Sequence, residues 1–224
     1  MILNSMKIAI ITAMKEEAYH IIKQYNLHEV KRLHTLSIYE NESIVLALAG
    51  IGKIQATFGT VYILENYQVS KLINIWITGS LMGNEVKIGD VFLLSKIAQH
   101  DMYLPFNGSH LDYAKKEIHI VSKNYHFDWF DFTVRNDAFC LTGDQFIDNV
   151  EKVLELREKF SAHVIEMEAF AIASMAREYN MLDKCIFIKA ISDGANNDAI
   201  DAHMGNLDFA MRNSLRVLEK ILLK

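Results

Sequence analysis

Apolar residues along this chain follow two patterns, short unbroken runs and longer stretches with a spacing of three or four residues. Residues 7–13 are a run rich in β-branched side chains, and residues 15–25 repeat apolar positions at helical spacing. We predict a strand followed by a helix there. Residues 35–40 and 43–49 are two more apolar runs, and the two polar residues between them favour a tight antiparallel hairpin.

Two glycines, Gly50 and Gly52, precede the next helical stretch, residues 54–67. Because glycine allows positive φ and close backbone approach, this segment favours a turn into a helix N-terminus. Residues 72–77 are continuously apolar, which is typical of a central parallel strand that then runs into a loop. We predict four further strands, at residues 91–98, 138–141, 164–165 and 185–191. We also predict a helix that ends near residue 160 and another over residues 169–176. A C-terminal helix carries the apolar stripe Leu207, Met211, Leu215, Leu218 and Leu222.

Two segments between these elements have less regular patterns. Residues 142–145 read Thr-Gly-Asp-Gln and resemble a capping box at the start of the helix that ends near residue 160. Residues 100–135 are rich in aromatic residues and in Asn, Asp and Gly, and we predict a loop with short strands. Overall, the alternation of strands with helices predicts an α/β fold, a three-layer α/β/α sandwich with a mixed central sheet, as one domain over residues 1–224.

The composition indicates which classes of partner and which cellular compartment fit the chain. The chain has 23 basic and 28 acidic residues, which argues against nucleic acid or an anionic membrane as a partner. Cys140 and Cys185 lie in apolar runs without a CxxC pattern, as in proteins of a reducing cytoplasm. No apolar run reaches the roughly 18 residues of a membrane span, and the start lacks a leader pattern, so we expect a cytoplasmic protein.

Polar residues follow several of the predicted strands at the point where each strand ends. They are Glu16-Glu17, Thr78-Gly79-Ser80, the carboxylates Glu166 and Glu168, and Asp193. In open α/β sheets such strand ends gather on one edge, where ligands bind. When carboxylates share a partly dry cleft, their pKa values are pushed apart. One can then act as an acid and another as a base.

Each of these residues also has a purely structural explanation. Glu17 lies in the first turn of a helix, where the helix dipole favours acidic side chains, and Asp193 fits the cap of the segment that follows it. Glu168 is harder to explain structurally, because a buried unpaired carboxylate is costly, although Glu166 fits a structural pairing. Lys189 lies four residues before Asp193 in an apolar strand, where a lysine is either paired or functional.

Metal and cofactor sites have little support in the sequence. His100-Asp101 provides two possible metal ligands, but no third ligand stands at a recognisable spacing, so ordinary hydrogen-bonding groups explain the pair better. Gly50-Ile51-Gly52 is too short for a dinucleotide-binding fingerprint, and there is no Walker sequence. We therefore expect neither a metal nor a cofactor.

Taken together, several motifs resemble those of the 5′-methylthioadenosine/S-adenosylhomocysteine nucleosidases, a family within the purine nucleoside phosphorylase superfamily. The similarity covers nearly the whole chain. The motifs that carry it begin at Ile10 (IITAMKEE), Gly50 (GIGK), Thr78 (TGSL), Lys87 (KIGD), Thr142 (TGDQFI), Ile165 (IEMEA) and Ala190 (AISD).

The resemblance implies a cofactor-independent hydrolysis of the N-glycosidic bond between adenine and a 5′-thio-substituted ribose. It implies that Asp193 protonates the purine at N7 and that Glu17 positions and deprotonates the attacking water. It further implies that Glu168 holds the ribose hydroxyls. The other substrate-binding residues expected are Met167 against the sugar, Phe146 and Ile147 at the adenine, and Thr78, Gly79 and Lys189. A homodimer is also implied.

The chain departs from the family pattern at three places. One is the stretch between His100 and Thr142, which is shorter than usual and lacks a clear helix, so a different pocket for the 5′ substituent is expected. Trp76-Ile77-Thr78-Gly79 stands where the family usually has Gly-Ser/Thr-Ala-Gly, so that Ile77 replaces a small hydroxyl residue near the water. Lys189 replaces the usual arginine and loses its planar fork. Two alternatives therefore remain beside the nucleosidase. One is a phosphate-dependent nucleoside phosphorylase, which the negative charge of Glu17 disfavours. The other is a nucleoside-binding protein without turnover.

Overall fold

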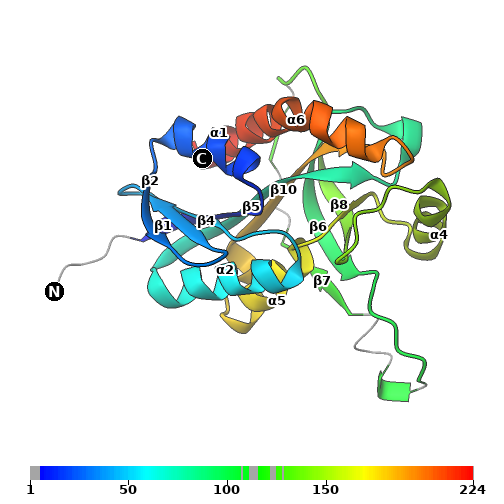
Figure 1. Cartoon of the computed structure of the whole chain (residues 1–224), viewed down its shortest axis with the longest axis horizontal. Coiled ribbons are helices and arrows are strands. Elements are labelled where there is room, and N and C mark those ends of the chain that lie inside the picture. The colour runs from blue at the N-terminus through cyan, green and yellow to red at the C-terminus, as the bar shows by residue number, and fades with distance from the viewer. Residues whose placement is uncertain (1–5, 107, 111–115, 122–124, 128, 224) are drawn as a thin grey trace.

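A mixed β-sheet runs through the middle of the molecule, and helices cover both of its faces (Figure 1). The computed structural model describes residues 6–106, 108–110, 116–121, 125–127 and 129–223. Within these ranges the sheet has ten strands, of which some neighbours are parallel and others antiparallel. The predicted α/β sandwich with a mixed central sheet is confirmed.

The first part of the chain follows the sequence pattern closely. The elements are β1 (Lys7–Thr12), α1 (Lys15–Tyr25), β2 (His28–Arg32), β3 (Ser37–Glu40) and β4 (Ile44–Leu48). Strands β3 and β4 form the predicted antiparallel hairpin. Strand β2 was not predicted, because all five of its residues are exposed and it lies at the sheet edge beside β3.

The central part supplies the longest strand. Its elements are α2 (Lys53–Asn66), β5 (Val69–Ser80), β6 (Val91–Gln99), β7 (Glu117–His119) and β8 (Val134–Thr142). Strand β5 does not end before Thr78, as the apolar run suggested, but continues through Ser80 because it pairs there with the strands on either side. The predicted loop with short strands between residues 100 and 135 contains β7, and parts of it lie outside the described residues.

The last part contains α4 (Val150–Phe160), β9 (Val164–Glu166), α5 (Ala169–Glu178), β10 (Cys185–Asp193) and α6 (Ala199–Leu222). The predicted capping box at residues 142–145 is wrong. Helix α4 starts later, and its cap is Asn149, whose side-chain oxygen accepts the Lys152 N–H at 2.9 Å. The hydroxyl of Thr142 is used elsewhere, since it donates to Glu166 Oε1 at 2.6 Å.

Strand β10 closes part of the sheet on itself. It pairs in parallel with β5 and antiparallel with β6, while β6, β8, β9 and β5 are joined in that order. These strands therefore form a closed ring of hydrogen-bonded neighbours, and β1, β4, β3 and β2 extend from β5 as an open sheet. The carboxyl ends of β5 and β10 lie side by side, because Asp193 pairs with Gly79.

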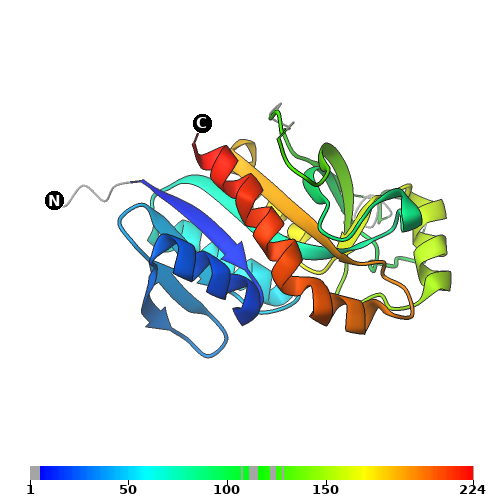
Figure 2. The ribbon, with the colours of Figure 1, turned by 90° about the horizontal axis from the view of Figure 1, so that it is seen from above.

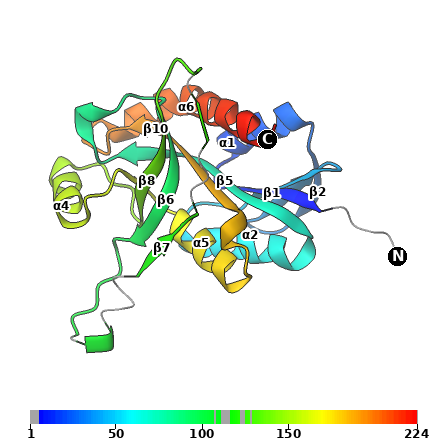
Figure 3. The same ribbon diagram turned by 180° about the vertical axis from the view of Figure 1, so that it is seen from behind.

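Apolar side chains fill the space between the sheet and the helices on each of its two faces. Along β1, Ile10 faces the core under α1 and α6, whereas Ala9 and Ile11 face the core under α2 and α5. This is the alternation that a strand buried on both faces requires. Viewed from above and from behind, α1 and α6 lie together on one face while α2 and α5 lie on the other (Figures 2 and 3). Helix α4 lies at the far end beside β8.

No helix in the described part of the chain combines the length and the apolar composition that a membrane span requires.

Candidate active site

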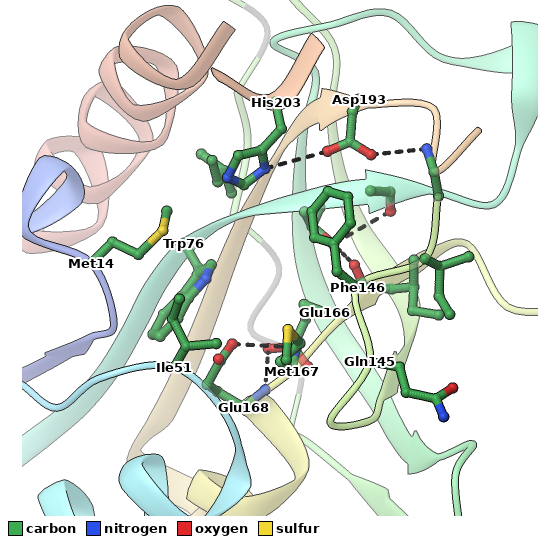
Figure 4. A pocket seen from close by; sticks show the side chains of 16 residues that line it. Met14, Ile51, Trp76, Gln145, Phe146, Glu166, Met167, Glu168, Asp193 and His203 are labelled. Atoms are coloured by element: carbon green, nitrogen blue, oxygen red, sulfur yellow. Dashed lines mark hydrogen bonds and ion pairs between the residues drawn. The ribbon is translucent and has the colours of Figure 1, made fainter. Parts of the chain in front are cut away.

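A cavity opens where β5, β9 and β10 end, and it holds about 570 Å³ of empty space including its mouth (Figure 4). Most of the residues predicted from sequence lie in its wall. These are Thr78, Gly79, Phe146, Ile147, Met167, Glu168 and Asp193. The other lining residues are Met14, Ile51, Trp76, Ile77, Gln145, Ile165, Glu166, Ala195 and His203.

Glu166 holds the corner between β9 and α5. Its carboxylate accepts the Thr142 hydroxyl and the N–H groups of Glu168 at 3.1 Å and Ala169 at 2.8 Å. It also pairs with Lys189 Nζ at 2.8 Å, and both side chains are almost fully buried. Since its oxygens are all engaged by the protein, Glu166 fixes the geometry of the corner.

Glu168 projects from this corner into the cavity. Its Oε1 accepts the Gly52 N–H at 2.7 Å, and its Oε2 accepts the Met167 N–H at 3.2 Å. Burial raises the pKa of Glu168 well above its ordinary value, and the nearby charge of Glu166 raises it further. The two carboxylates point in different directions, as their separation by one residue predicts.

The loop before α2 brings the Gly52 N–H to Glu168. Gly52 has φ +92°, and a Cβ there would lie 3.0 Å from Asp144 Oδ1. The same oxygen accepts the Lys53 N–H at 2.8 Å. Lys53 Nζ pairs with Asp101 at 2.7 Å, and Asp101 accepts the Asp144 N–H at 2.8 Å. This network ties three loops together, so the donor to Glu168 is held in place.

Asp193 lies on the opposite wall at the end of β10. Ser192 is an extra residue in the ladder with β5, because Ile191 pairs with Thr78 and Asp193 pairs with Gly79. Asp193 Oδ1 accepts the Ala195 N–H at 2.8 Å, and its Oδ2 accepts the Ser192 hydroxyl at 2.7 Å. The bulge and these two donors aim a nearly buried carboxyl group at the cavity.

Glu17 lies behind the cavity wall and is fully buried. Its Oε2 accepts the Thr12 hydroxyl at 2.9 Å and the Met14 N–H at 3.1 Å, and its Oε1 lies 3.4 Å from the Ile77 nitrogen. Burial raises its pKa to about 7 against the lowering effect of these donors. Met14 and Ile77 line the cavity, so Glu17 is one layer away from the space that a ligand would fill.

Lys189 is the other predicted site residue that does not line the cavity. It is fully buried, and besides Glu166 its ammonium group faces the Trp76 ring at 5.2 Å from the centroid. Trp76 itself lines the cavity. The structure therefore places Lys189 beneath the wall, where it balances the charge of Glu166.

His203 is a residue of the site that the sequence reasoning missed. It lies on α6, its Nδ1 is 3.6 Å from Asp193 Oδ2, and its ring meets the Phe146 ring edge-on at 5.5 Å (Figure 4). Nothing in the sequence distinguishes it from the other histidines, because only folding brings α6 over the end of β10.

His100 and Asp101 are not arranged as metal ligands. Asp101 is engaged by Lys53, and both ring nitrogens of His100 are buried without a partner. The His100 ring instead packs on Gly143, where a Cβ would lie 2.2 Å from Nε2. Burial lowers the pKa of His100. Across the described ranges, no group of three His, Cys, Asp or Glu side chains is placed to hold a metal ion.

The cavity combines carboxyl groups with an aromatic side chain. A carboxyl group of raised pKa, Glu168, faces an aromatic side chain, Phe146, and a second carboxyl group, Asp193. Among the described residues in the wall there is no lysine or arginine. Such a site suits a neutral ligand with hydroxyl groups and an aromatic ring, and it disfavours an anion.

Known proteins are similar to this chain over most of its length. The family model described as "Phosphorylase superfamily" matches residues 7–223. A 5′-methylthioadenosine/S-adenosylhomocysteine nucleosidase of Buchnera aphidicola is 30% identical over an alignment of 220 positions that covers 91% of this chain and 92% of the relative. One from Bacillus cytotoxicus is 28% identical and covers 97% of this chain and 98% of the relative.

A solved structure is similar over almost the same span. The nucleosidase of Neisseria meningitidis in complex with methylthio-immucillin-A has a TM-score of 0.83 and 25% identity, and the match covers 96% of this chain and 98% of that one. A related activity also occurs among the relatives. The aminodeoxyfutalosine nucleosidase of Helicobacter pylori is 24% identical over 96% of this chain and 97% of the relative.

Proposed function

The chain belongs to the phosphorylase superfamily, and from this premise we propose that it is a nucleosidase that hydrolyses the N-glycosidic bond of 5′-methylthioadenosine, S-adenosylhomocysteine or a related adenine nucleoside. The observation that carries the proposal is the convergence of Glu168, Asp193 and Phe146 on one cavity. The nucleosidase names of the relatives support the same reaction.

We assign the sugar to the side of the cavity formed by Glu168 and Met167. Glu168 has one oxygen on the Gly52 N–H and the other on the Met167 N–H, so its outer lone pairs are available to ribose hydroxyls. Met167 lies in the wall beside it and provides an apolar surface. The oxygen lone pairs of Glu168 also face the positive charge that the sugar acquires as the bond breaks.

We assign the base to the opposite side, formed by Phe146, Ile147 and Asp193. Phe146 is 44% exposed, which leaves its ring free to stack on a purine, and Ile147 lies in the same wall. Asp193 then protonates the purine at N7, so that the base leaves as a neutral molecule. One positioned proton transfer is worth ~10²–10⁴-fold in rate.

We assign the water to Glu17. Because its pKa is raised to about 7, Glu17 takes up a proton from water near neutral pH more readily than an ordinary carboxylate. Its position behind Met14 and Ile77 requires these side chains or Trp76 to move when substrate binds.

Phosphorolysis is the less favoured reaction. A phosphate nucleophile needs cationic partners, whereas the described cavity wall has three acidic side chains, Glu166, Glu168 and Asp193, and the nearby Lys189 is already paired with Glu166. The described wall of the cavity offers phosphate no unpaired cationic side chain, and this favours water as the nucleophile.

The enclosure of Glu17 supports a second candidate, a nucleoside-binding protein without turnover. Trp76 and Ile77 stand where the family has small residues, and Glu17 has no exposed surface. The two candidates share a ligand and differ in the fate of its glycosidic bond.

One experiment separates these possibilities. The native chain is incubated with 5′-methylthioadenosine, S-adenosylhomocysteine, adenosine and inosine, with and without phosphate, and free base is measured by chromatography. We expect adenine release without phosphate, and its loss in Glu17→Gln and in Asp193→Asn. Strict dependence on phosphate would show a phosphorylase, and calorimetric binding without release of base would show the binding protein.

We further propose a cytoplasmic homodimer that acts in nucleoside catabolism and methionine salvage. Large apolar side chains on α2 and after β6 support the dimer, because they are exposed on the monomer. They are Ile54 at 78%, Phe58 at 45%, Tyr103 at 82% and Phe106 at 56% exposure.

A further inference from the structure

His203 lies beside the carboxyl group that the proposed reaction uses as an acid. Its Nδ1 is 3.6 Å from Asp193 Oδ2 and 3.5 Å from Ser192 Oγ. The Ser192 hydroxyl in turn donates to Asp193 Oδ2 at 2.7 Å. The imidazole nitrogen, the hydroxyl oxygen and the carboxyl oxygen thus all lie within 3.6 Å of one another.

A hydrogen bond joins helix α6 to the end of β10 beside these three groups, so the fold itself holds His203 near Asp193. Asn206, one turn after His203, donates its side-chain N–H to the Ser192 carbonyl at 3.0 Å. The edge-on contact with Phe146 holds the imidazole from the other side. Catalytic contacts are often longer in ligand-free structures and shorten when substrate binds, so 3.5 Å is within reach of a hydrogen bond.

Solvent access differs sharply between the two side chains. The Asp193 side chain is 3% exposed, whereas the His203 side chain is 19% exposed. A buried acid that gives up a proton in every turnover needs a route by which it regains one. Imidazole is the side chain that gains and loses protons near neutral pH, and His203 is the more exposed of the two side chains.

We propose that His203 returns a proton to Asp193 through the Ser192 hydroxyl after each departure of the base, so that His203 acts on the reaction through Asp193. This role rests on the proposed nucleosidase activity. His203 is then a positioning residue, because it acts through Asp193 and not on the substrate.

Each turnover moves one proton from Asp193 to the base and one from water to Glu17. The electron pair of the C1′–N9 bond passes to the purine while Asp193 gives its proton to N7, which leaves Asp193 as a carboxylate. Water adds to C1′ and loses a proton to Glu17, which releases it to solvent. Protonated His203 then passes its Nδ1 proton to Ser192 Oγ, which passes its own to Asp193 Oδ2, and neutral His203 takes a proton from solvent.

Few charged groups compete with this exchange. Among the described residues of the cavity wall, the ionisable side chains besides His203 and Asp193 are Glu166 and Glu168. Glu166 is paired with Lys189, and Glu168 is held by the Gly52 and Met167 N–H groups. Asp193 and the Ser192 hydroxyl are the polar groups within 3.6 Å of His203 Nδ1 in the described structure.

His203→Phe tests the proposal through the pH profile of turnover. Phenylalanine keeps a ring against Phe146 but cannot carry a proton. With 5′-methylthioadenosine as substrate, we expect kcat to fall about 10²-fold at pH 8 and much less at pH 5.5, with KM within about twofold of the native value. A kcat–pH profile that superimposes on that of the native chain overturns the proposal.

Two further variants exclude a merely structural effect. His119→Phe makes the same substitution at an exposed position on β7, 74% exposed, and should leave the profile unchanged. His203→Ala leaves room at the same place, so added imidazole should restore kcat several-fold, whereas it should not restore His203→Phe. Absence of rescue in His203→Ala counts against the relay.

Binding of adenine alone gives a measurement that does not depend on turnover. Because the base accepts a shared proton from Asp193, we expect His203→Phe to bind adenine about tenfold more weakly than the native chain at pH 8 and equally at pH 5.5, measured by calorimetry. Equal affinities at both pH values overturn the relay. If the native chain binds adenine but releases none from nucleosides, the proposed function fails while this comparison still decides the role of His203.

Discussion

Burial controls the charge of Glu17, and this links the site to the stability of the fold. The pKa of Glu17 rises from an ordinary 4.5 to about 7, with burial as the main cause. Between these values the folded chain holds a proton that the unfolded chain has lost. Stability therefore falls as pH rises through this window, by on the order of 3 kcal/mol.

Glu17→Gln should remove this dependence. Glutamine does not titrate, so the variant should not share the loss of stability that the native chain shows between pH 5 and pH 8. In urea unfolding, its free energy of unfolding relative to that of the native chain should therefore rise by about 3 kcal/mol over that interval. Glu16→Gln, at the exposed neighbouring position, serves as the control and should follow the native chain. Parallel stability curves for Glu17→Gln and the native chain would contradict the assignment.

The pair of Lys189 and Glu166 makes a second prediction at this scale. Lys189→Met leaves a buried carboxylate without its counter-charge, which should lower the free energy of unfolding by about 3–5 kcal/mol. Adding Glu166→Gln removes that charge and should recover most of the loss. The measurement is a double-mutant cycle by urea unfolding, and strictly additive effects would refute the pairing.

Single residues differ in how far the sequence could identify them. Glu166 and Glu168 stand out because carboxylates next to a buried strand are costly, and Asp193 because it ends an apolar run. The catalytic role of Asp193 and the substrate-binding role of Glu168 stay predictions. His203 carries no such signal, since a histidine on an amphipathic helix is ordinary and its importance comes from a contact with β10 that only tertiary structure creates.

Secondary structure elements were predicted best where burial alternates clearly. Helix α1 covers the predicted residues, with Ala18 and Ile21 buried as its spacing requires. Strand β2 has no buried residue and therefore no pattern. The start of α4 was placed too early because Thr142 resembles a cap, whereas its hydroxyl bonds with Glu166 and accepts the Phe170 N–H.

The segment between β8 and α4 depends on contact with His100. A Cβ on Gly143 would lie 2.2 Å from His100 Nε2, so Gly143→Ala should displace the segment that carries Phe146 and Ile147. We expect a loss of about 1–3 kcal/mol in stability and a higher KM, measured by thermal unfolding and steady-state kinetics. Combining it with His100→Ala provides space and should restore both, and no such recovery would contradict the packing explanation.

For the whole molecule, the class of fold was accessible from sequence but the order of strands was not. Alternating strands and helices predict an α/β sandwich. The insertion of β10 between β5 and β6 depends on which strand edges meet in space, and local sequence does not encode it.

The proposed homodimer is a prediction at the same scale. Ile54→Asp places a charge on the exposed apolar face of α2, where Ile54 is 78% exposed, and should convert the dimer to a monomer in analytical ultracentrifugation. Leu154→Asp, at a 58% exposed position on α4, is the matched control and should leave the mass unchanged. A native chain that sediments as a monomer at micromolar concentration would rule the dimer out.

The late position of β10 in the chain has a consequence for synthesis on the ribosome. Strands β5 and β6 emerge early, yet each leaves one side unpaired until residues 185–193 have followed. Unpaired apolar strand edges tend to pair with other chains. Nascent chains on neighbouring ribosomes are therefore exposed to one another until translation is almost complete, and slow translation before Cys185 should increase aggregation of the new protein.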